Sequence, residues 1–331
     1  MNYKTSVALC TYNGKDFIEQ QIDSILNQTV LPDELIISDD GSNDGTVEIV
    51  KKKLAKSHLK YKVMINNTKL GVIKNFERAI LHCEGDIIFT SDQDDIWLED
   101  KVEYIKNMFN LNEKLSIVFT DAYLVDKNLS KTGVRLWDAV YPEMKKIKTK
   151  QDILKALLKG NIMTGATMAF KRSLIQQITP FNEYWIHDYW IAITGTLIGE
   201  VQSIDKPLIL YRQHDNNVIG ASKLSVTEKI IMYFRNFYKL DLIRMEKYNK
   251  FSSLREFISN YNNGVFDDFD KHLIYQYGEF WKKMINLKSK GKINGVGIIA
   301  KEYFRGNYSR YYNGIRSVIR DIISIVLKKN S

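Results

Sequence analysis

The sequence predicts an α/β fold in which helices flank a mostly parallel sheet and a helical, basic C-terminal extension follows. Three observations support this prediction. Short apolar runs alternate with segments of helical spacing over the first hundred residues, which is typical of a parallel sheet with right-handed crossovers. Aspartate-rich clusters follow several of the apolar runs. Most of the excess positive charge lies beyond residue 220.

The elements are predicted from apolar runs, which indicate strands, and from helical spacing of apolar residues. The N-terminal pattern predicts strands at 6–10, 34–38, 61–65 and 86–90, and helices at 17–26, 46–55 and 73–81. Later signals predict strands at 116–120, 166–170 and 207–211, and helices at 152–158 and 188–197. The polar stretch 126–150 is assigned to no element.

Positive charge is concentrated in the C-terminal third. Residues 1–220 contain 27 Lys and Arg against 29 Asp and Glu, whereas residues 221–331 contain 21 against 10, so the net charges are −2 and +11. Helical spacing recurs at 230–242 and 315–326. We expect an α/β domain over 1–220, followed by a basic, mainly helical region over 221–331 that associates with a membrane or mediates oligomerisation.

Cysteine usage and hydropathy indicate the compartment. Cys10 and Cys83 are too few for a disulfide framework. The apolar run at 6–10 is too short for a signal peptide, and no run approaches the roughly 20 apolar residues of a membrane-spanning helix. We therefore expect a cytoplasmic protein, and the basic C-terminal region predicts that it associates peripherally with the inner face of the plasma membrane.

Polar clusters follow three predicted strands. They are Thr11-Tyr12-Asn13, Asp39-Asp40 and Asp92-Gln93-Asp94-Asp95. Because parallel sheets bind ligands at the carboxyl ends of their strands, these clusters predict one site. Neighbouring carboxylates raise one another's pKa, and a divalent metal, Mn²⁺ or Mg²⁺, would neutralise them. The alternative is that the aspartates only cap turns and helices, with Asp94 and Asp95 preceding a helix that begins at Trp97.

Two common phosphate-binding motifs are missing from the sequence. No G-x-G-x-x-G follows the first strand, so a dinucleotide-binding fold is not predicted, and no G-x-x-x-x-G-K-[ST] P-loop occurs. We therefore expect a metal, rather than a glycine-rich loop, to hold any phosphate.

Five motifs occur in a fixed order between residues 10 and 220. They are Cys10-Thr11-Tyr12-Asn13 with 24–29, Ser38-Asp39-Asp40-Gly41-Ser42, Ser91 to Trp97, His187-Asp188-Tyr189-Trp190, and Tyr211-Arg212-Gln213-His214. In this order they resemble the family-2 glycosyltransferases of the GT-A fold, and within them the rhamnosyltransferase-like enzymes of bacterial surface polysaccharides. The resemblance implies a Rossmann-like GT-A catalytic domain over 1–220. It also implies inverting transfer of a sugar, such as L-rhamnose, from a nucleotide diphosphate.

The resemblance assigns the donor site to the first two motifs. Cys10, Thr11 and Tyr12 would surround the base of a dTDP- or UDP-sugar. Asp40 would accept a hydrogen bond from the pyrimidine.

The later motifs would supply the metal site and the base. The resemblance implies that Asp92 lies near the ribose and the metal, that Asp94 binds the metal, and that His214 adds a metal contact. Asp188 would be the catalytic base, since direct attack by an acceptor hydroxyl needs one group to take its proton. The alternative for Asp188 is the N-cap of the following helix.

Four residues are predicted to contact the acceptor, which is expected to be lipid-linked or a polysaccharide: Trp97, Gly165, His187 and Trp190. Tryptophan rings stack on sugars but equally fill cores. Gly165 would leave space for an acceptor or simply occupy a turn.

Two other functions compete with a glycosyltransferase. A non-catalytic nucleotide-sugar or membrane-binding scaffold would have no need of Asp92, Asp94 and Asp188. A sugar nucleotidyltransferase would normally carry a glycine-rich, basic loop after the first strand, which this chain lacks. The basic region predicts an anionic membrane surface or a homodimer as its partner. Nucleic acid is not predicted, because no nucleic-acid-binding module accompanies the charge.

Overall fold

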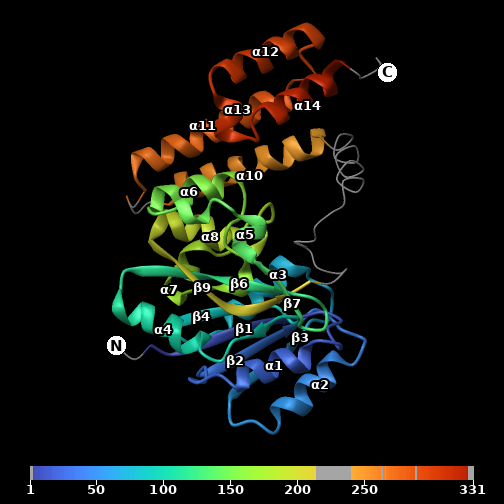
Figure 1. Cartoon of the computed structure of the whole chain (residues 1–331), viewed down its shortest axis with the longest axis vertical. Coiled ribbons are helices and arrows are strands. Elements are labelled where there is room, and N and C mark those ends of the chain that lie inside the picture. The colour runs from blue at the N-terminus through green and yellow to red at the C-terminus, as the bar shows by residue number, and fades with distance from the viewer. Residues whose placement is uncertain (1–2, 214–239, 262–263, 265, 288, 327–331) are drawn as a thin grey trace. The chain divides into compact units, whose positions relative to one another are not determined.

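The computed structural model describes residues 3–213, 240–261, 264, 266–287 and 289–326. The chain divides into two compact units, one formed by residues 1–157 and 161–222 and the other by 158–160 and 223–331. Figure 1 labels the elements of both units.

The first unit contains a single sheet and the helices that cover it. Its strands are β1 (Thr5–Thr11), β2 (Glu34–Asp39), β3 (Lys60–Ile65), β4 (Ile87–Ser91), β5 (Ile96–Trp97), β6 (Leu115–Val125), β7 (Lys131–Arg135), β8 (Met168–Lys171) and β9 (Glu200–Arg212). Its helices are α1 (Ile18–Leu26), α2 (Thr46–Leu54), α3 (Val72–Leu81), α4 (Lys101–Leu111), α5 (Leu136–Val140), α6 (Lys150–Lys159), α7 (Arg172–Ile178) and α8 (His187–Ile198). Two 3₁₀ turns, η1 (Met144–Lys146) and η2 (Gly165–Thr167), complete it.

The nine strands follow the order β3-β2-β1-β4-β8-β6-β9-β5, and β7 pairs with β6. The pairs β1–β2, β1–β4, β2–β3 and β6–β9 are parallel. The pairs β4–β8, β6–β8, β5–β9 and β6–β7 are antiparallel. Because β1, β2, β3 and β4 run in one direction, their carboxyl ends meet at one edge of the sheet.

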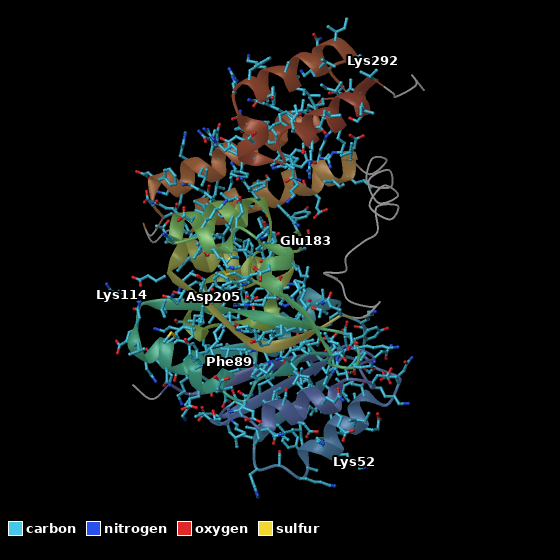
Figure 2. The ribbon with its side chains drawn as sticks, viewed as in Figure 1. Lys52, Phe89, Lys114, Glu183, Asp205 and Lys292 are labelled. Carbon is cyan, nitrogen blue, oxygen red and sulfur yellow. The ribbon has the colours of Figure 1, made fainter. Side chains whose placement is uncertain are left out.

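Alternating side chains divide each strand between two helical layers. Val7 and Leu9 of β1 join one core with apolar residues of α1, α2 and α4, and Figure 1 shows α1 and α2 on the same side of β1 and β2. Helices α3 and α8 contact each other, and between them they contact β1, β2, β6 and β9. Phe89 of β4 is fully buried in the sheet layer (Figure 2). Burial on both faces explains why these strands are almost continuously apolar.

The predicted fold class is confirmed, and the differences from the predicted elements have physical causes. Strand β6 continues past Thr120 because the carboxylate of Asp121 is buried with an ion pair to Arg135 Nε at 2.7 Å and accepts the Trp137 amide hydrogen. The predicted helix start at Trp97 is wrong: Ile96 and Trp97 form β5, and α4 begins at Lys101. The unassigned stretch 126–150 contains β7 and α5.

The second unit contains helices only, within the described residues. They are α10 (Leu240–Asn260), α11 (Asp268–Ile285), α12 (Lys292–Phe304), α13 (Asn307–Tyr311) and α14 (Ile315–Val326). Aromatic rings of α11 and α13 pack edge to face around Phe280. A buried ion pair joins Arg244 Nη2 of α10 to Asp321 Oδ1 of α14 at 2.7 Å. None of the helices in the described ranges combines the length and the apolar character needed to cross a bilayer.

Candidate active site

A cavity of about 610 Å³ lies where β1, β2 and β4 end. Parallel pairing sets Thr11 beside Asp39 and Leu9 beside Ser91, so the loops after the three strands converge. The cavity is lined by Cys10, Thr11, Tyr12, Asn13, Phe17, Asp40, Lys69, Gly71, Val72, Asn75, Phe76, Asp92, Gln93, Asp94, Thr164, Gly165, Ile186, His187, Asp188 and Tyr211. Nine of the twelve residues that were assigned a role in the sequence analysis therefore line one cavity.

The two aspartates after β2 have different environments. Asp39 is fully buried and accepts hydrogen bonds from the Thr11 and Ser42 hydroxyls, each at 2.6 Å, so it holds the turn together. Asp40 lines the cavity and accepts the Leu70 amide hydrogen at 2.7 Å and the Gly71 amide hydrogen at 2.9 Å. It also accepts a hydrogen bond from Asn66 Nδ2 at 2.8 Å. A carboxylate has about four acceptor positions, so Asp40 retains capacity for one ligand donor.

Gln93, the middle residue of the aspartate cluster, connects the loops after β1 and β4. Its Oε1 accepts the Tyr12 amide hydrogen at 2.9 Å and its Nε2 donates to the Tyr12 carbonyl at 3.1 Å. Gly14 makes this pairing possible, because a Cβ at that position would collide with the Gln93 amide. The pairing fixes the Tyr12 backbone at the mouth of the cavity.

Asp92, Asp94 and Asp188 line the cavity, and Asp95 is buried next to Asp94 in the chain. Burial, with the charges of Asp94 and Asp188, raises the pKa of Asp92 to about 8. Burial followed by the charges of Asp94 and Asp92 also raises the pKa of Asp95. Without a cation these carboxyl groups therefore hold their protons more tightly than usual, as expected where like charges share a dry site.

Two buried basic residues, Lys101 and Arg212, lie near these carboxylates, and neither was among the predicted site residues. Lys101 is fully buried; its Nζ donates to the Ala166 carbonyl at 2.7 Å and lies over the Trp97 ring. Burial lowers the pKa of Lys101 to about 7, while Asp95 and Asp92 oppose this shift. Nothing in the sequence pattern distinguishes Lys101 from a surface lysine at a helix start.

Arg212, the last residue of β9, anchors the loop that follows β4. Its Nε donates to the Asp94 carbonyl at 2.7 Å and its amide nitrogen donates to Asp95 Oδ1 at 3.1 Å. Its Nη2 also donates to Gln20 of α1 at 2.7 Å. Its position within the last of the five motifs is the sequence signal that could have identified Arg212 as a site residue.

Asp188 is in the first turn of α8, whose N-cap is Ile186, so Asp188 is not the N-cap. Its Oδ2 accepts the Gly165 amide hydrogen at 3.0 Å. Burial raises the pKa of Asp188 to about 6, although hydrogen bonds from Gly165 and Tyr189 oppose the shift. A carboxylate with this pKa is mostly ionised at neutral pH and can accept a proton.

His187 lies beside Asp188 and is stacked on Phe76 with ring centroids 3.7 Å apart. Within the described residues, neither of its buried ring nitrogens has a hydrogen-bond partner. Burial lowers the pKa of His187 to about 3, so the ring is neutral. A Cβ at Gly165 would lie 3.3 Å from both His187 Nε2 and Asp188 Cβ, so the glycine leaves space between these side chains.

Three predicted residues are not among those that line the cavity. Trp97 is buried in the core against Phe89. Trp190 is buried as well and donates its indole hydrogen to the Ile178 carbonyl at 2.9 Å. His214 lies outside the described residues.

The donor set in the cavity fits a hard divalent ion. Among the described residues no three His, Cys, Asp or Glu side chains are grouped to hold a metal by themselves. Asp92 and Asp94 both line the cavity, and the charge of Asp94 raises the pKa of Asp92. Protein sites for Mg²⁺ often supply one or two carboxylates and leave the other positions to substrate phosphates and water.

A cavity at the carboxyl ends of parallel strands is the place where α/β proteins bind their ligands. The family model for Glycosyl transferase family 2 matches residues 6–179. The chain belongs to this family and is a glycosyltransferase. The identification made from the five motifs is confirmed.

The chain is similar to several known proteins. It is 29% identical over 260 residues to the dTDP-rhamnosyl transferase RfbG of Shigella flexneri, with 73% of this chain and 81% of the relative covered. The S. aureus TarS 1–349 structure in complex with UDP-GlcNAc has a TM-score of 0.56 at 17% identity, covering 95% of this chain and 90% of that one. The mannosyltransferase PcManGT from Pyrobaculum calidifontis, in complex with GDP-Man and Mn²⁺, has a TM-score of 0.52 at 16% identity, covering 100% and 89%.

The raised pKa of Asp92 predicts a stabilising substitution. Because the folded-state pKa of about 8 exceeds the ordinary value of 3.8, the folded state binds this proton more tightly, and ionisation costs stability as the pH rises from 4 to 8. In metal-free buffer at pH 8, Asp92→Asn should raise the free energy of unfolding by about 0.5–2 kcal/mol, a gain common when a functional site is relieved of strain.

Thermal unfolding at pH 5 and pH 8 measures this effect, and the gain should shrink at pH 5. Asp152→Asn is the matched control, since the Thr149 hydroxyl and nearby amide hydrogens lower the pKa of Asp152. That variant should be destabilised at pH 8. An Asp92→Asn protein that is less stable than the parent at pH 8 would contradict the account.

Proposed function

We propose that the protein is an inverting glycosyltransferase that moves a sugar, such as L-rhamnose, from a nucleotide diphosphate to a bacterial surface polysaccharide acceptor. The observation that carries the proposal is that Asp92, Asp94 and Asp188 line the same cavity as Tyr12 and Asp40. The leaving diphosphate would need a metal held by Asp92 and Asp94, and the attacking hydroxyl would need a base such as Asp188. Both kinds of group must therefore lie in one cavity. The similarity to a dTDP-rhamnosyl transferase supports the choice of sugar.

The donor nucleotide is proposed to occupy the end of the cavity near β1 and β2. Cys10, Thr11 and Tyr12 would surround a pyrimidine, and Asp40 would accept a hydrogen bond from its ring N–H. The Leu70 and Gly71 amides support this role, because they hold the Asp40 carboxylate at the wall of the cavity. A dTDP- or UDP-sugar is the expected donor.

Asp92 and Asp94 are proposed to hold Mn²⁺ or Mg²⁺ together with the diphosphate. Once bound, the ion would act as a Lewis acid that stabilises negative charge on the leaving diphosphate. His214 is retained as an additional proposed contact. Lys101 and Arg212, behind the carboxylates, would limit the cost of gathering them before the donor arrives.

Asp188 is proposed as the base that takes the proton of the acceptor hydroxyl during attack on the anomeric carbon. One carboxylate and one direct displacement give inversion at that carbon. Neutral His187 would accept or donate a hydrogen bond to a sugar hydroxyl in the space left by Gly165. Trp97 and Trp190, both buried, would act on the acceptor only through the packing around the site.

The C-terminal unit is proposed to bring the enzyme to the inner face of the plasma membrane, where a lipid-linked acceptor would be available. Its net positive charge supports an anionic membrane surface as the partner. A homodimer formed through the same unit is the alternative.

Product analysis with a panel of labelled sugar nucleotides tests the overall proposal. Transfer or slow hydrolysis of dTDP-rhamnose or a UDP-sugar should release the nucleoside diphosphate. Formation of a nucleoside triphosphate in the presence of pyrophosphate would instead identify a nucleotidyltransferase. Binding without any product would identify a scaffold.

Replacing Asp188 should remove the base and leave the donor site intact. Asp188→Asn should slow transfer by about 10²–10⁴-fold, the usual contribution of a general base, while calorimetric affinity for the nucleotide stays near that of the parent. The parent's rate should fall as the pH drops below about 6, because protonated Asp188 cannot accept a proton. Asp138→Asn, at an exposed position, is the control. Loss of donor binding in Asp188→Asn would count against the catalytic role.

Removing the metal or one of its carboxylates should weaken donor binding as well as turnover. Chelator should abolish activity, and Mn²⁺ or Mg²⁺ should restore it. Asp94→Asn should lower the affinity for the nucleotide in the presence of Mn²⁺, because the diphosphate loses its counter-ion. Asp95→Asn should have a smaller effect on this affinity, since Asp95 is buried against Arg212. Full activity in excess chelator would contradict the assignment.

A further inference from the structure

Helix α14 buries polar residues and leaves part of its apolar side exposed. Its buried residues are Ser317, Val318, Asp321, Ser324 and Ile325, whereas Ile315, Ile319 and Val326 are each about half exposed. At about 100° per residue, the three apolar residues lie on one side of the helix, opposite Asp321. A surface helix of a globular protein normally turns its whole apolar side to the core, whereas α14 leaves these three residues outward and buries Val318 and Ile325.

The buried side of α14 is fixed by a hydrogen-bonded network. Arg244 Nη2 donates to Asp321 Oδ1 at 2.7 Å and to Ser324 Oγ at 3.2 Å, and the Tyr308 hydroxyl donates to Asp321 Oδ2 at 2.8 Å. Arg244 and Asp321 are both almost completely buried. Rotating the helix to bury Ile315 and Ile319 would leave these charges without partners, so these two side chains are held outward.

Helix α12 adds two prominent apolar side chains. Ile293 is 88% exposed and Phe304 is 85% exposed, opposite the buried Gly295 and Ile299. Helix α12 packs closely on α14, since a Cβ at Gly295 would lie 2.9 Å from Ile325 Cδ1. The outer face is defined here as Ile293, Phe304, Ile315, Ile319 and Val326.

The exposed charge of the segment that carries the outer face has one sign. Residues 281–331 contain 12 Lys and Arg but only two acidic residues, Glu302 and Asp321. Both acidic side chains are buried, and Glu302 Oε1 accepts a hydrogen bond from Lys283 Nζ at 2.9 Å. In the described part of this region every exposed charged side chain is therefore basic. Lys292, labelled in Figure 2, is one of the exposed basic residues at the ends of α12.

We propose that the outer face docks on an anionic lipid bilayer, with its apolar side chains at the headgroup boundary and the surrounding Lys and Arg on lipid phosphates. Apolar area combined with positive charge is what interfacial helices use. A symmetric dimer through this face would bring the same basic residues together with no exposed carboxylate to pair with them. The docking itself is argued from these helices alone. Only the idea that docking brings the enzyme to a lipid-linked acceptor rests on the proposed function.

Flotation of the full-length protein with vesicles tests the docking. Binding to vesicles containing phosphatidylglycerol and phosphatidylcholine is expected at low salt. It should be much weaker for phosphatidylcholine alone, and it should fall in high salt as the Debye length shortens. Absence of binding to the anionic vesicles at low salt would overturn the proposal.

A pair of substitutions without change of charge tests the outer face itself. Ile293→Ser with Phe304→Ser should lower the vesicle partition coefficient by about tenfold or more, because two large side chains no longer insert. Leu81→Ser with Leu111→Ser is the matched control, since both leucines are exposed in the first unit, and it should bind like the parent. Equal binding by both pairs would overturn the assignment of this face.

Two further measurements separate the possible outcomes. Lys290→Gln with Arg316→Gln should weaken binding and reduce its salt dependence, whereas Lys51→Gln with Lys52→Gln should do neither.

Sedimentation velocity tests whether a second copy of the chain covers the outer face. A dimer of the parent protein that becomes monomeric in the variant Ile293→Ser with Phe304→Ser would overturn the proposal in favour of a second copy. Release of nucleoside diphosphate in lipid-free buffer tests the proposed function separately, so vesicle binding by an inactive protein would leave the docking intact.

Discussion

Negative charge confined to one edge of the sheet is the constraint on which the rest of the catalytic unit depends. Parallel pairing of β1 with β2 and β4 places their carboxyl ends together, and α8 brings Asp188 to the same cavity. Burial and mutual repulsion raise the pKa of Asp92 and Asp95. A fold that brings these carboxylates together needs basic residues fixed nearby. It also needs a loop after β4 that is held in place, so that the carboxylates do not separate into solvent.

The chain meets both needs with residues distant in sequence. Lys101, from the start of α4, supplies a buried ammonium, and its bond to the Ala166 carbonyl ties α4 to the turn that presents the Gly165 amide to Asp188. Arg212, from the end of β9, holds the Asp94 carbonyl and Asp95. The same contacts that offset the charge therefore also position the carboxylates. Sites of this kind are precise because their supporting residues are themselves bonded.

The sequence predicted the α/β fold, the four N-terminal strands and the three loops that form the cavity, because local apolar patterns and strand-end polar clusters carry that information. It did not predict that β6 continues through Asp121, since a charged residue looks like the end of a strand until Arg135 is known to pair with it. The burial of Lys101, Trp97 and Trp190 was not predicted either. Their burial depends on partners far along the chain, which a local pattern does not reveal.

Helix α14 extends this lesson to the second unit. Its repeating isoleucines predict an amphipathic helix, but the pattern alone suggests that the isoleucines face the core. The buried pair of Arg244 with Asp321 shifts the inward side, so that Ile325 is buried but Ile315 and Ile319 stay about half exposed. Burying both acidic residues of the segment 281–326 also leaves the exposed charges of its described residues uniformly basic. The two units therefore handle charge in opposite ways. The first gathers carboxylates in a cavity suited to a metal and a diphosphate. In the second, the described segment 281–326 buries its two carboxylates, Glu302 and Asp321, and presents apolar and basic side chains outward.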